Sequence, residues 1–297
     1  MRAVEQRAYV TIARWPDSMN AESRTRVLCE IAGLDPYVAQ QRVTQGAPLI
    51  VMRAEPEVAR GIIEQLRARG VVACAPTRDQ LAKLAPPMRA KAMAAAPGAP
   101  EPMYMVESWK EESRGLRARD IALLVRGRLD NSTVRTGLDA GPRGTGLVAA
   151  AALGGAGVAL HMASNPGPTR STTFKFTEML DIYLRDGSRI RIDGDKFSFD
   201  VLGPEKGYTD AENMDKLTLR LGGEAPRAIV DTGFAKFRCP LEMIKDFSHA
   251  VSHSTVRRQD QKPAFDFYSA WTVYVCKALV SGVKEPGGGS QTPQKKH

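Results

Sequence analysis

The alternation of apolar and polar positions predicts regular structure near the start of the chain. Residues 7–78 give a strand, two helices, a strand, a helix and a last strand in that order. The stretch EPEVARGIIEQLRARG places Val58, Ile62, Ile63 and Leu66 on one helical face before Gly70, and a glycine commonly ends a helix. The pattern therefore predicts a compact β-α-α-β-α-β sandwich.

A second region of clear patterning begins near residue 171. Residues 179–185 and 189–193 alternate on either side of Asp186-Gly187, a pair that favours a type I′ hairpin turn. Asp193-Gly194-Asp195 predicts a turn into a third strand over residues 196–202. Residues 210–222 predict a helix capped by Thr209 or Asp210, and the aromatic residues 265–275 predict a core strand or helix.

The segments between these regions have other compositions. Residues 81–106 are rich in alanine and proline and predict a linker. Residues 107–129 predict a helix with one basic side, which is either a solvated face or a contact to an anionic surface; its arginines are Arg114, Arg117, Arg119, Arg126 and Arg128. Residues 144–164 form an apolar Gly/Ala-rich segment, read as a buried or flexible stretch or, alternatively, as a membrane span.

These elements predict the α+β fold class with two domains. The boundaries are residues 1–80 for the small α/β domain, 81–106 for the linker, 107–170 for the basic helix and apolar segment, 171–282 for a β-rich α+β domain, and 283–297 for a disordered tail.

The stretch GAPLIVMRAEPEVARGIIEQLRARGVVACAP resembles the C-terminal domain of the large-subunit ribosomal stalk protein and the related Clp-protease adaptor fold. The matching features are Gly33-Leu34, Gly46-Ala47-Pro48, and the helix from Leu66 to Gly70 before the last strand. The resemblance implies the fold and a general docking role. Arg24 and Arg26 lie near the stalk domain's partner-binding helices, but no histidine occurs in residues 7–78 for a Clp-adaptor peptide pocket.

Charge and cysteine content narrow the class of protein only slightly. The formal net charge of +9 allows attraction to nucleic acid or anionic lipid, although 33 acidic residues are interleaved with 42 basic ones and no recognition motif is present. Cys29, Cys74, Cys239 and Cys276 form no Cys-x-x-Cys pair, which predicts buried reduced thiols. With no apolar leader at the N-terminus, the expected location is the cytoplasm.

The tripeptide Asp231-Thr232-Gly233 is the best candidate for chemistry because it matches the catalytic loop of aspartic proteases. Retroviral-type proteases place this loop after a hairpin like LTLRLGG and RAIVDTG, and two aspartates then share one proton. One chain supplies one such aspartate, and residues 234–281 contain no glycine for the flap and closing strand. We therefore interpret Asp231 as a turn former.

Metal-binding candidates are sparse. His249 and His253 are four residues apart, and Cys239 or Cys276 could complete a zinc site, but solvated or capping histidines are the simpler interpretation. The carboxylates that follow the hairpin lack calcium-loop spacing and predict turn or strand-edge positions; they are Asp181, Asp186, Asp193, Asp195 and Asp200.

The sequence thus favours a non-catalytic cytoplasmic interaction or adaptor protein without a cofactor. A protein partner is expected, with Arg24, Arg26, Arg117 and Arg119 as candidate contacts. The alternatives are an enzyme built on Asp231, a membrane-attached protein held through residues 144–164, and a nucleic-acid binder. The oligomeric state stays open.

Overall fold

A computed structural model describes residues 7–137, 169–238, 251–253, 256–259 and 261–282, and the side chains of 131–174 and 251–260 are not part of that description. The chain divides into two compact units. Unit 1 comprises residues 1–128, 178–247 and 264–297, and unit 2 comprises residues 129–177 and 248–263. Helices and mixed sheets occur together, which confirms the α+β class.

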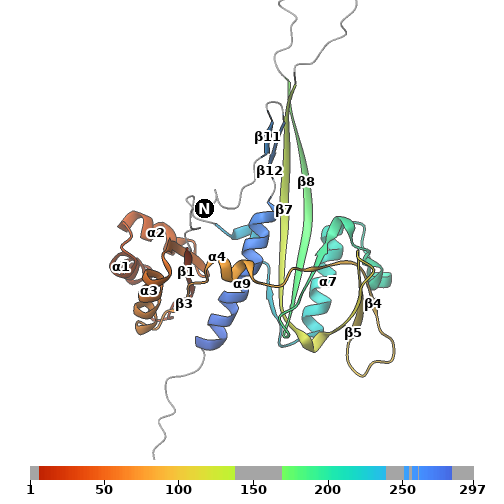
Figure 1. The fold of residues 1–297 in the computed structure, drawn as a ribbon, viewed down its shortest axis with the longest axis horizontal. Coiled ribbons are helices and arrows are strands. Elements are labelled where there is room, and N and C mark those ends of the chain that lie inside the picture. Colours follow the sequence, from red (N-terminus) through yellow and green to blue (C-terminus); the bar gives the residue numbers. More distant parts are fainter. Residues whose placement is uncertain (1–6, 138–168, 239–250, 254–255, 260, 283–297) are drawn as a thin grey trace, which may run out of the picture. The chain divides into compact units, whose positions relative to one another are not determined.

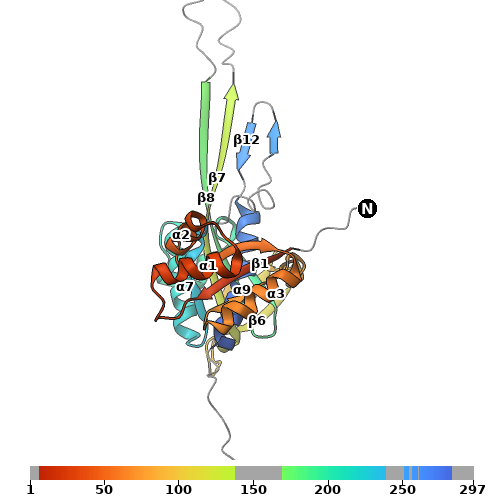
Figure 2. The same cartoon turned by 90° about the vertical axis from the view of Figure 1, so that its left-hand side faces the viewer.

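The N-terminal part of unit 1 contains the elements β1 (Ala8–Arg14), α1 (Ala21–Ala32), α2 (Pro36–Thr44), β2 (Leu49–Ala54), α3 (Pro56–Ala68) and β3 (Val72–Cys74). The strands form an antiparallel sheet in the order β2-β1-β3, and the three helices pack on one face of it (Figures 1 and 2). Asn20 caps α1, and Gly33 ends that helix in the left-handed conformation. A separate hydrophobic core, centred on Val10, Ile12, Leu28 and Leu66, holds this layer together.

Residues 78–137 differ from the expected linker and basic helix. They form α4 (Arg78–Ala82), β4 (Met88–Ala95), β5 (Met103–Ser108), β6 (Ser113–Arg117), the short 3-10 helix η1 (Ala118–Asp120) and β7 (Ile121–Gly137). The prediction of a helix over 107–129 is wrong, because β5 ends at Ser108 and β6 and β7 cover most of the range. Strand β5 buries every second residue, Tyr104, Val106 and Ser108, and β6 buries Leu116. That alternation buries one face of a sheet, which a helical period cannot do.

A large sheet follows the strand order β11-β12-β7-β8-β9-β4-β5-β6, and β10 (Ile229–Asp231) pairs in parallel with β7. Its remaining strands are β8 (Thr169–Leu184), β9 (Arg189–Asp193), β11 (Val251–His253) and β12 (Val256–Gln259). In unit 2, β12 pairs with β11 and with the second half of β7.

Helix α7 (Asp210–Glu224) fills the second core of unit 1. Figure 1 shows α7 between the β7–β8 pair and the β4–β5 pair. Met214, Leu217 and Leu221 are fully buried among the apolar residues of β4 to β9. Thr209 caps α7, as expected, and the helix continues two residues beyond Gly222.

The predicted hairpin is confirmed, with Met179 paired to Asp193 and Tyr183 paired to Arg189. Its turn is not type I′, because Gly187 has a positive φ of 85° and Asp186 does not. The third strand expected over 196–202 is wrong as well. These residues form the 3-10 helices η2 (Gly194–Lys196) and η3 (Phe199–Glu205), which bury Phe199 and Leu202 against α7.

The aromatic segment near the C-terminus forms α9 (Lys262–Gly282), and η4 (Gly233–Lys236) precedes it in unit 1. Phe265 and Trp271 are almost completely buried, and the Trp271 Nε1–H donates to Thr11 Oγ1 at 2.9 Å. Of the two alternatives predicted for residues 265–275, the helix is therefore correct, and Cys276 lies on it. Among the described residues no helix is long and apolar enough to cross a membrane, and segments 144–164 and 283–297 lie outside the described residues.

Candidate functional site

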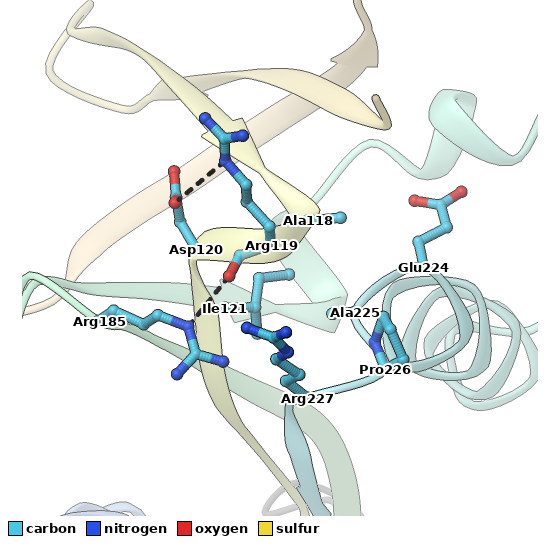
Figure 3. A pocket seen from close by; sticks show the side chains of 9 residues that line it. All are labelled: Ala118, Arg119, Asp120, Ile121, Arg185, Glu224, Ala225, Pro226 and Arg227. Carbon is cyan, nitrogen blue, oxygen red and sulfur yellow. Dashed lines mark hydrogen bonds and ion pairs between the residues drawn. The ribbon is translucent and has the colours of Figure 1, made fainter. Parts of the chain in front are cut away.

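A pocket of about 350 Å³ opens on unit 1 where three separate segments meet. One wall comes from η1 and the start of β7, a second from the turn that follows β8, and a third from the end of α7 (Figure 3). The lining residues are Ala118, Arg119, Asp120, Ile121, Arg185, Glu224, Ala225, Pro226 and Arg227.

Backbone contacts fix the walls of this pocket. The Arg185 N–H donates to the Asp120 carbonyl at 2.9 Å, and the Arg185 Nε–H donates to the Arg119 carbonyl at 3.0 Å. At the end of α7, the Ala225 N–H donates to the Leu221 carbonyl at 3.0 Å. Arg185, in the turn that follows β8, therefore holds η1 in place, and the rest of its guanidinium is exposed to solvent.

The arginines of the pocket differ in their partners. Arg119 pairs with Glu101 and lies 3.9 Å from Asp120. Arg185 contacts a carbonyl only, and within the part of the chain that the structure describes neither Arg185 nor Arg227 has an acidic partner. In Figure 3 the guanidinium ends of Arg185 and Arg227 lie on the same side of the opening. Two exposed cations with unused donors are what an anion requires.

Glu224 contributes the opposite charge, and a buried tyrosine holds it. The Tyr104 hydroxyl donates to Glu224 Oε2 at 2.6 Å, and Tyr104 is only 3% exposed. Burial and this carboxylate raise the pKa of Tyr104 well above its ordinary value, so the phenol stays a donor. Three arginines face one aspartate and one glutamate, which leaves the lining with a formal excess of one positive charge.

The chemistry of the lining suits binding. Among the described residues, its ionisable groups are the carboxylates Asp120 and Glu224 and three arginines, and it contains no histidine, cysteine, serine or lysine. Ala118, Ile121, Ala225 and Pro226 supply apolar walls beside the charged rim. Such a surface holds an anionic group attached to an apolar body.

The structure separates the arginines expected to contact a partner. Arg119 lines the pocket, and the exposed Arg117 immediately precedes Ala118, the first lining residue in the sequence. Arg24 and Arg26 lie on α1, where Arg26 pairs with Glu22 at 3.1 Å and Arg24 lies over the Trp15 ring. The basic side of the helix predicted over 107–129 indicated Arg119, whereas Arg185 and Arg227 carried no local signal in the sequence.

Asp231 ends β10 and forms a turn. The Gly233 N–H donates to Asp231 Oδ1 at 3.1 Å, and the Tyr268 hydroxyl donates to the same oxygen. Gly233 does not have a positive φ; a Cβ there would instead lie 2.6 Å from the Tyr268 oxygen. These contacts use the carboxylate as an acceptor within unit 1, and they support the turn interpretation.

The other candidate ligands do not assemble. His253 lies on a strand, β11, where a spacing of four residues does not place two side chains as it would on a helix. Cys239 and His249 lie outside the described residues. Among the residues that are described, no group of three or more His, Cys, Asp or Glu side chains could hold a metal ion. Cys29, Cys74 and Cys276 are free thiols.

A buried ion cluster joins β8, β9 and α9. Asp181 is completely buried and accepts from Arg191 Nε at 2.7 Å and Arg191 Nη2 at 2.8 Å, and also from Arg189 and Ser269. Arg191 reaches on to Asp266, which is 46% exposed. The expectation of a strand-edge carboxylate at Asp181 is therefore wrong, because β9 faces it with two arginines. Protein donors occupy the oxygens of Asp181, so the cluster serves to tie β8, β9 and α9 together, and we call it the clasp.

Replacing Asp231 by asparagine is expected to lower the free energy of unfolding by about 1 kcal/mol, since the amide oxygen can still accept from Gly233 and Tyr268 but loses its charge. Urea denaturation of the purified protein measures this change. A loss above about 3 kcal/mol would exceed that of an ordinary hydrogen bond and contradict the turn role. Peptide cleavage that pepstatin blocks and the variant abolishes would restore the protease interpretation.

Comparison with known proteins adds no relative: no protein-family model matches the chain, and searches of curated proteins and of solved structures found no match.

Proposed function

We propose that this chain is a non-catalytic interaction protein, in which the pocket beside η1 holds an acidic group of a partner protein. The observation that carries the proposal is the pair Arg185 and Arg227, whose guanidinium groups face one opening without an acidic partner among the described residues. An unpaired exposed arginine is ordinary, but two at the mouth of an apolar pocket form a binding site for an anion.

The charge balance of the pocket favours a carboxylate over a phosphate group. A formal excess of one positive charge matches one carboxylate, whereas a phosphate carries about −1.5 to −2 at neutral pH. The Glu224 carboxylate, fixed by Tyr104, would repel the additional charge. Aspartate or glutamate side chains and a free chain end supply the required group on a protein partner.

The N-terminal part of unit 1 fits the same proposal. Its order of elements is the one that the ribosomal stalk and Clp-adaptor resemblance implies, and such domains dock onto other proteins. We also propose a cytoplasmic location for the protein. Burial raises the pKa of Cys74 to about 12 and that of Cys276 to about 11, so both remain protonated thiols of the kind a reducing compartment preserves.

An array of peptides tests the proposal. Each sequence is present in two forms, one with its Asp and Glu residues and one in which they are changed to Asn and Gln. We expect binding of acidic forms, followed by a loss of affinity of at least tenfold for the variant Arg185→Ala/Arg227→Ala, because each charge-assisted hydrogen bond contributes about 1.5–3 kcal/mol. Fluorescence anisotropy of the bound sequences measures the affinity.

The matched control is Arg60→Ala/Arg78→Ala, which removes the same charge from exposed positions on α3 and α4. Equal weakening by both double variants would show general attraction to a basic protein and would sink the proposal. Binding of amide forms as tightly as acidic forms would sink it as well. Tighter binding of single-stranded nucleic acid, lost in the pocket variant, would favour the nucleic-acid alternative.

A further inference from the structure

Strand β6 forms an edge of the large sheet beside the pocket. Within the described residues it pairs only with β5, in the antiparallel register that matches Tyr104 to Leu116 and Met105 to Gly115. The Ala118 N–H donates to the Pro102 carbonyl at 3.0 Å, and the Ser108 N–H donates to the Glu112 carbonyl at 2.8 Å.

Those two bonds settle which backbone groups of β6 remain unused. Hydrogen-bonded pairs alternate with non-bonded pairs along an antiparallel ladder. Since residues 112 and 118 bond to β5, residues 114 and 116 do so too. The N–H and C=O groups of Ser113, Gly115 and Arg117 therefore point away from β5, along the open edge.

This edge carries little of the protection that edges of natural sheets usually have. Proline and lysine block strand addition at many edges, yet the middle residue of β6 is Gly115 and the outward residues also include Ser113. All three outward residues are exposed, and Arg117 has no acidic partner among the residues described. The edge also leads directly to the pocket, because Ala118 follows Arg117.

We propose that β6 accepts an extended acidic segment of the partner protein by strand addition, so that the partner's carboxylate enters the neighbouring pocket. This inference rests on the proposed function. Unused backbone groups at Ser113, Gly115 and Arg117 supply the hydrogen bonds, and the free guanidinium groups of Arg117, Arg185 and Arg227 select the charge. At ~3.4 Å per residue, a strand of about five residues spans β6 and reaches η1.

The same charges argue against a second copy of this chain as the occupant. Two β6 strands paired with each other would place the Arg117 side chains of both copies on one strand pair, whereas Arg114 is already paired with Asp186. Like charges across a strand pair are destabilising. An acidic segment from another protein meets no such repulsion.

The test uses a defined probe, the free-acid peptide Thr-Val-Glu-Val-Thr-Val-Asp with an N-terminal fluorescein, and the full chain. We expect it to bind and to shift the backbone amide resonances of Ser113, Gly115 and Arg117 in the spectrum of the ¹⁵N-labelled protein. Two further peptides carry N-methyl groups at alternate residues, one at the odd-numbered positions and one at the even-numbered positions. Only one of the two should bind about tenfold more weakly than the unmethylated peptide. Only one edge of an added strand faces β6.

A pair of protein variants gives an independent measure. Gly115→Pro removes an outward N–H without removing a bond to β5, and Gly115→Ala is its matched control, because either residue places a Cβ 2.8 Å from the end of the flexible Met103 side chain. We expect the proline variant alone to weaken binding about tenfold. If the proline variant does not fold, the N-methylated peptides decide.

The outcomes separate this inference from the proposed function. Equal affinity of both N-methylated peptides, with binding still lost in Arg185→Ala/Arg227→Ala, overturns strand addition and leaves the pocket proposal standing. No binding of the probe, while array peptides still bind, also overturns strand addition. Self-association that shifts the three amides without any peptide would assign the edge to a second copy and overturn the acidic-partner assignment.

Discussion

Replacing Asp181 by alanine is expected to lower the free energy of unfolding by about 3–5 kcal/mol, the usual effect of removing one partner from a buried ion pair. The loss is large because two buried positive charges would remain. Arg189 is 8% exposed and Arg191 is 3% exposed, so both guanidinium groups would stay buried with much less opposing charge. The Nε of Arg189 already lacks a hydrogen-bond partner among the described residues. Urea denaturation followed by circular dichroism measures the loss.

A matched control is Glu57→Ala, which removes one carboxylate from an exposed pair with Arg60 on α3. Little change is expected there, because solvent screens exposed pairs. If both variants lost the same small amount of stability, the cluster would not be the buried clasp described above.

Acid should weaken the same clasp. Burial alone would raise the pKa of Asp181, but the hydrogen bonds and charges of Arg191 and Arg189 outweigh burial and hold this pKa below its ordinary value. A carboxyl whose pKa is lower in the folded state contributes its stability above the unfolded pKa of about 3.9, and loses it as the pH falls toward the folded pKa. The alanine variant should therefore lose less stability than the wild type between neutral pH and acid below about pH 4.

The sequence predicts best where local signals and burial agree. The alternating strands of the hairpin and the helix capped by Thr209 have residues whose local preferences match their final positions, and both are present, although the turn at Asp186-Gly187 is not type I′. The prediction for residues 88–117 was wrong because β4 is rich in alanine and contains a lysine, and β6 has a central glycine, and these residues have low strand propensity. Their strand conformation comes from pairing with β5 and β9, and a single sequence does not show that pairing.

Most residues of the candidate pocket could not be predicted from the sequence for the same reason. Arg119, Arg185 and Arg227 come from three segments, and only folding brings them to one opening. The partners that distinguish them are also distant, since Glu101 pairs with Arg119 and Tyr104 holds Glu224. The basic side of the predicted helix included one arginine of the three, Arg119, whereas pairing decides which of them is available to a ligand.

The glycine at position 127 is expected to be irreplaceable, and Gly127→Ala should lower the free energy of unfolding by about 3 kcal/mol, at the upper end of the range for overpacking. A Cβ there would lie 2.6 Å from two ring carbons of Phe265 and 2.9 Å from Phe234. These rings pack edge to face with centroids 5.2 Å apart, and the Arg191 guanidinium lies over the Phe265 ring. Moving Phe265 would therefore disturb the start of α9 and the ion cluster with it. Urea denaturation measures the change.

Gly61→Ala is the control for this last variant, because Gly61 lies in α3 and a Cβ there meets nothing within 4 Å. That substitution should raise stability by about 0.5–1 kcal/mol, since alanine favours a helix more than glycine does. Trimming the obstructing ring in Gly127→Ala/Phe265→Leu should recover part of the loss, because the two sites share one contact. A neutral Gly127→Ala, or a double variant whose losses simply add, would mean that Phe265 does not pack against β7 and that α9 is not anchored there.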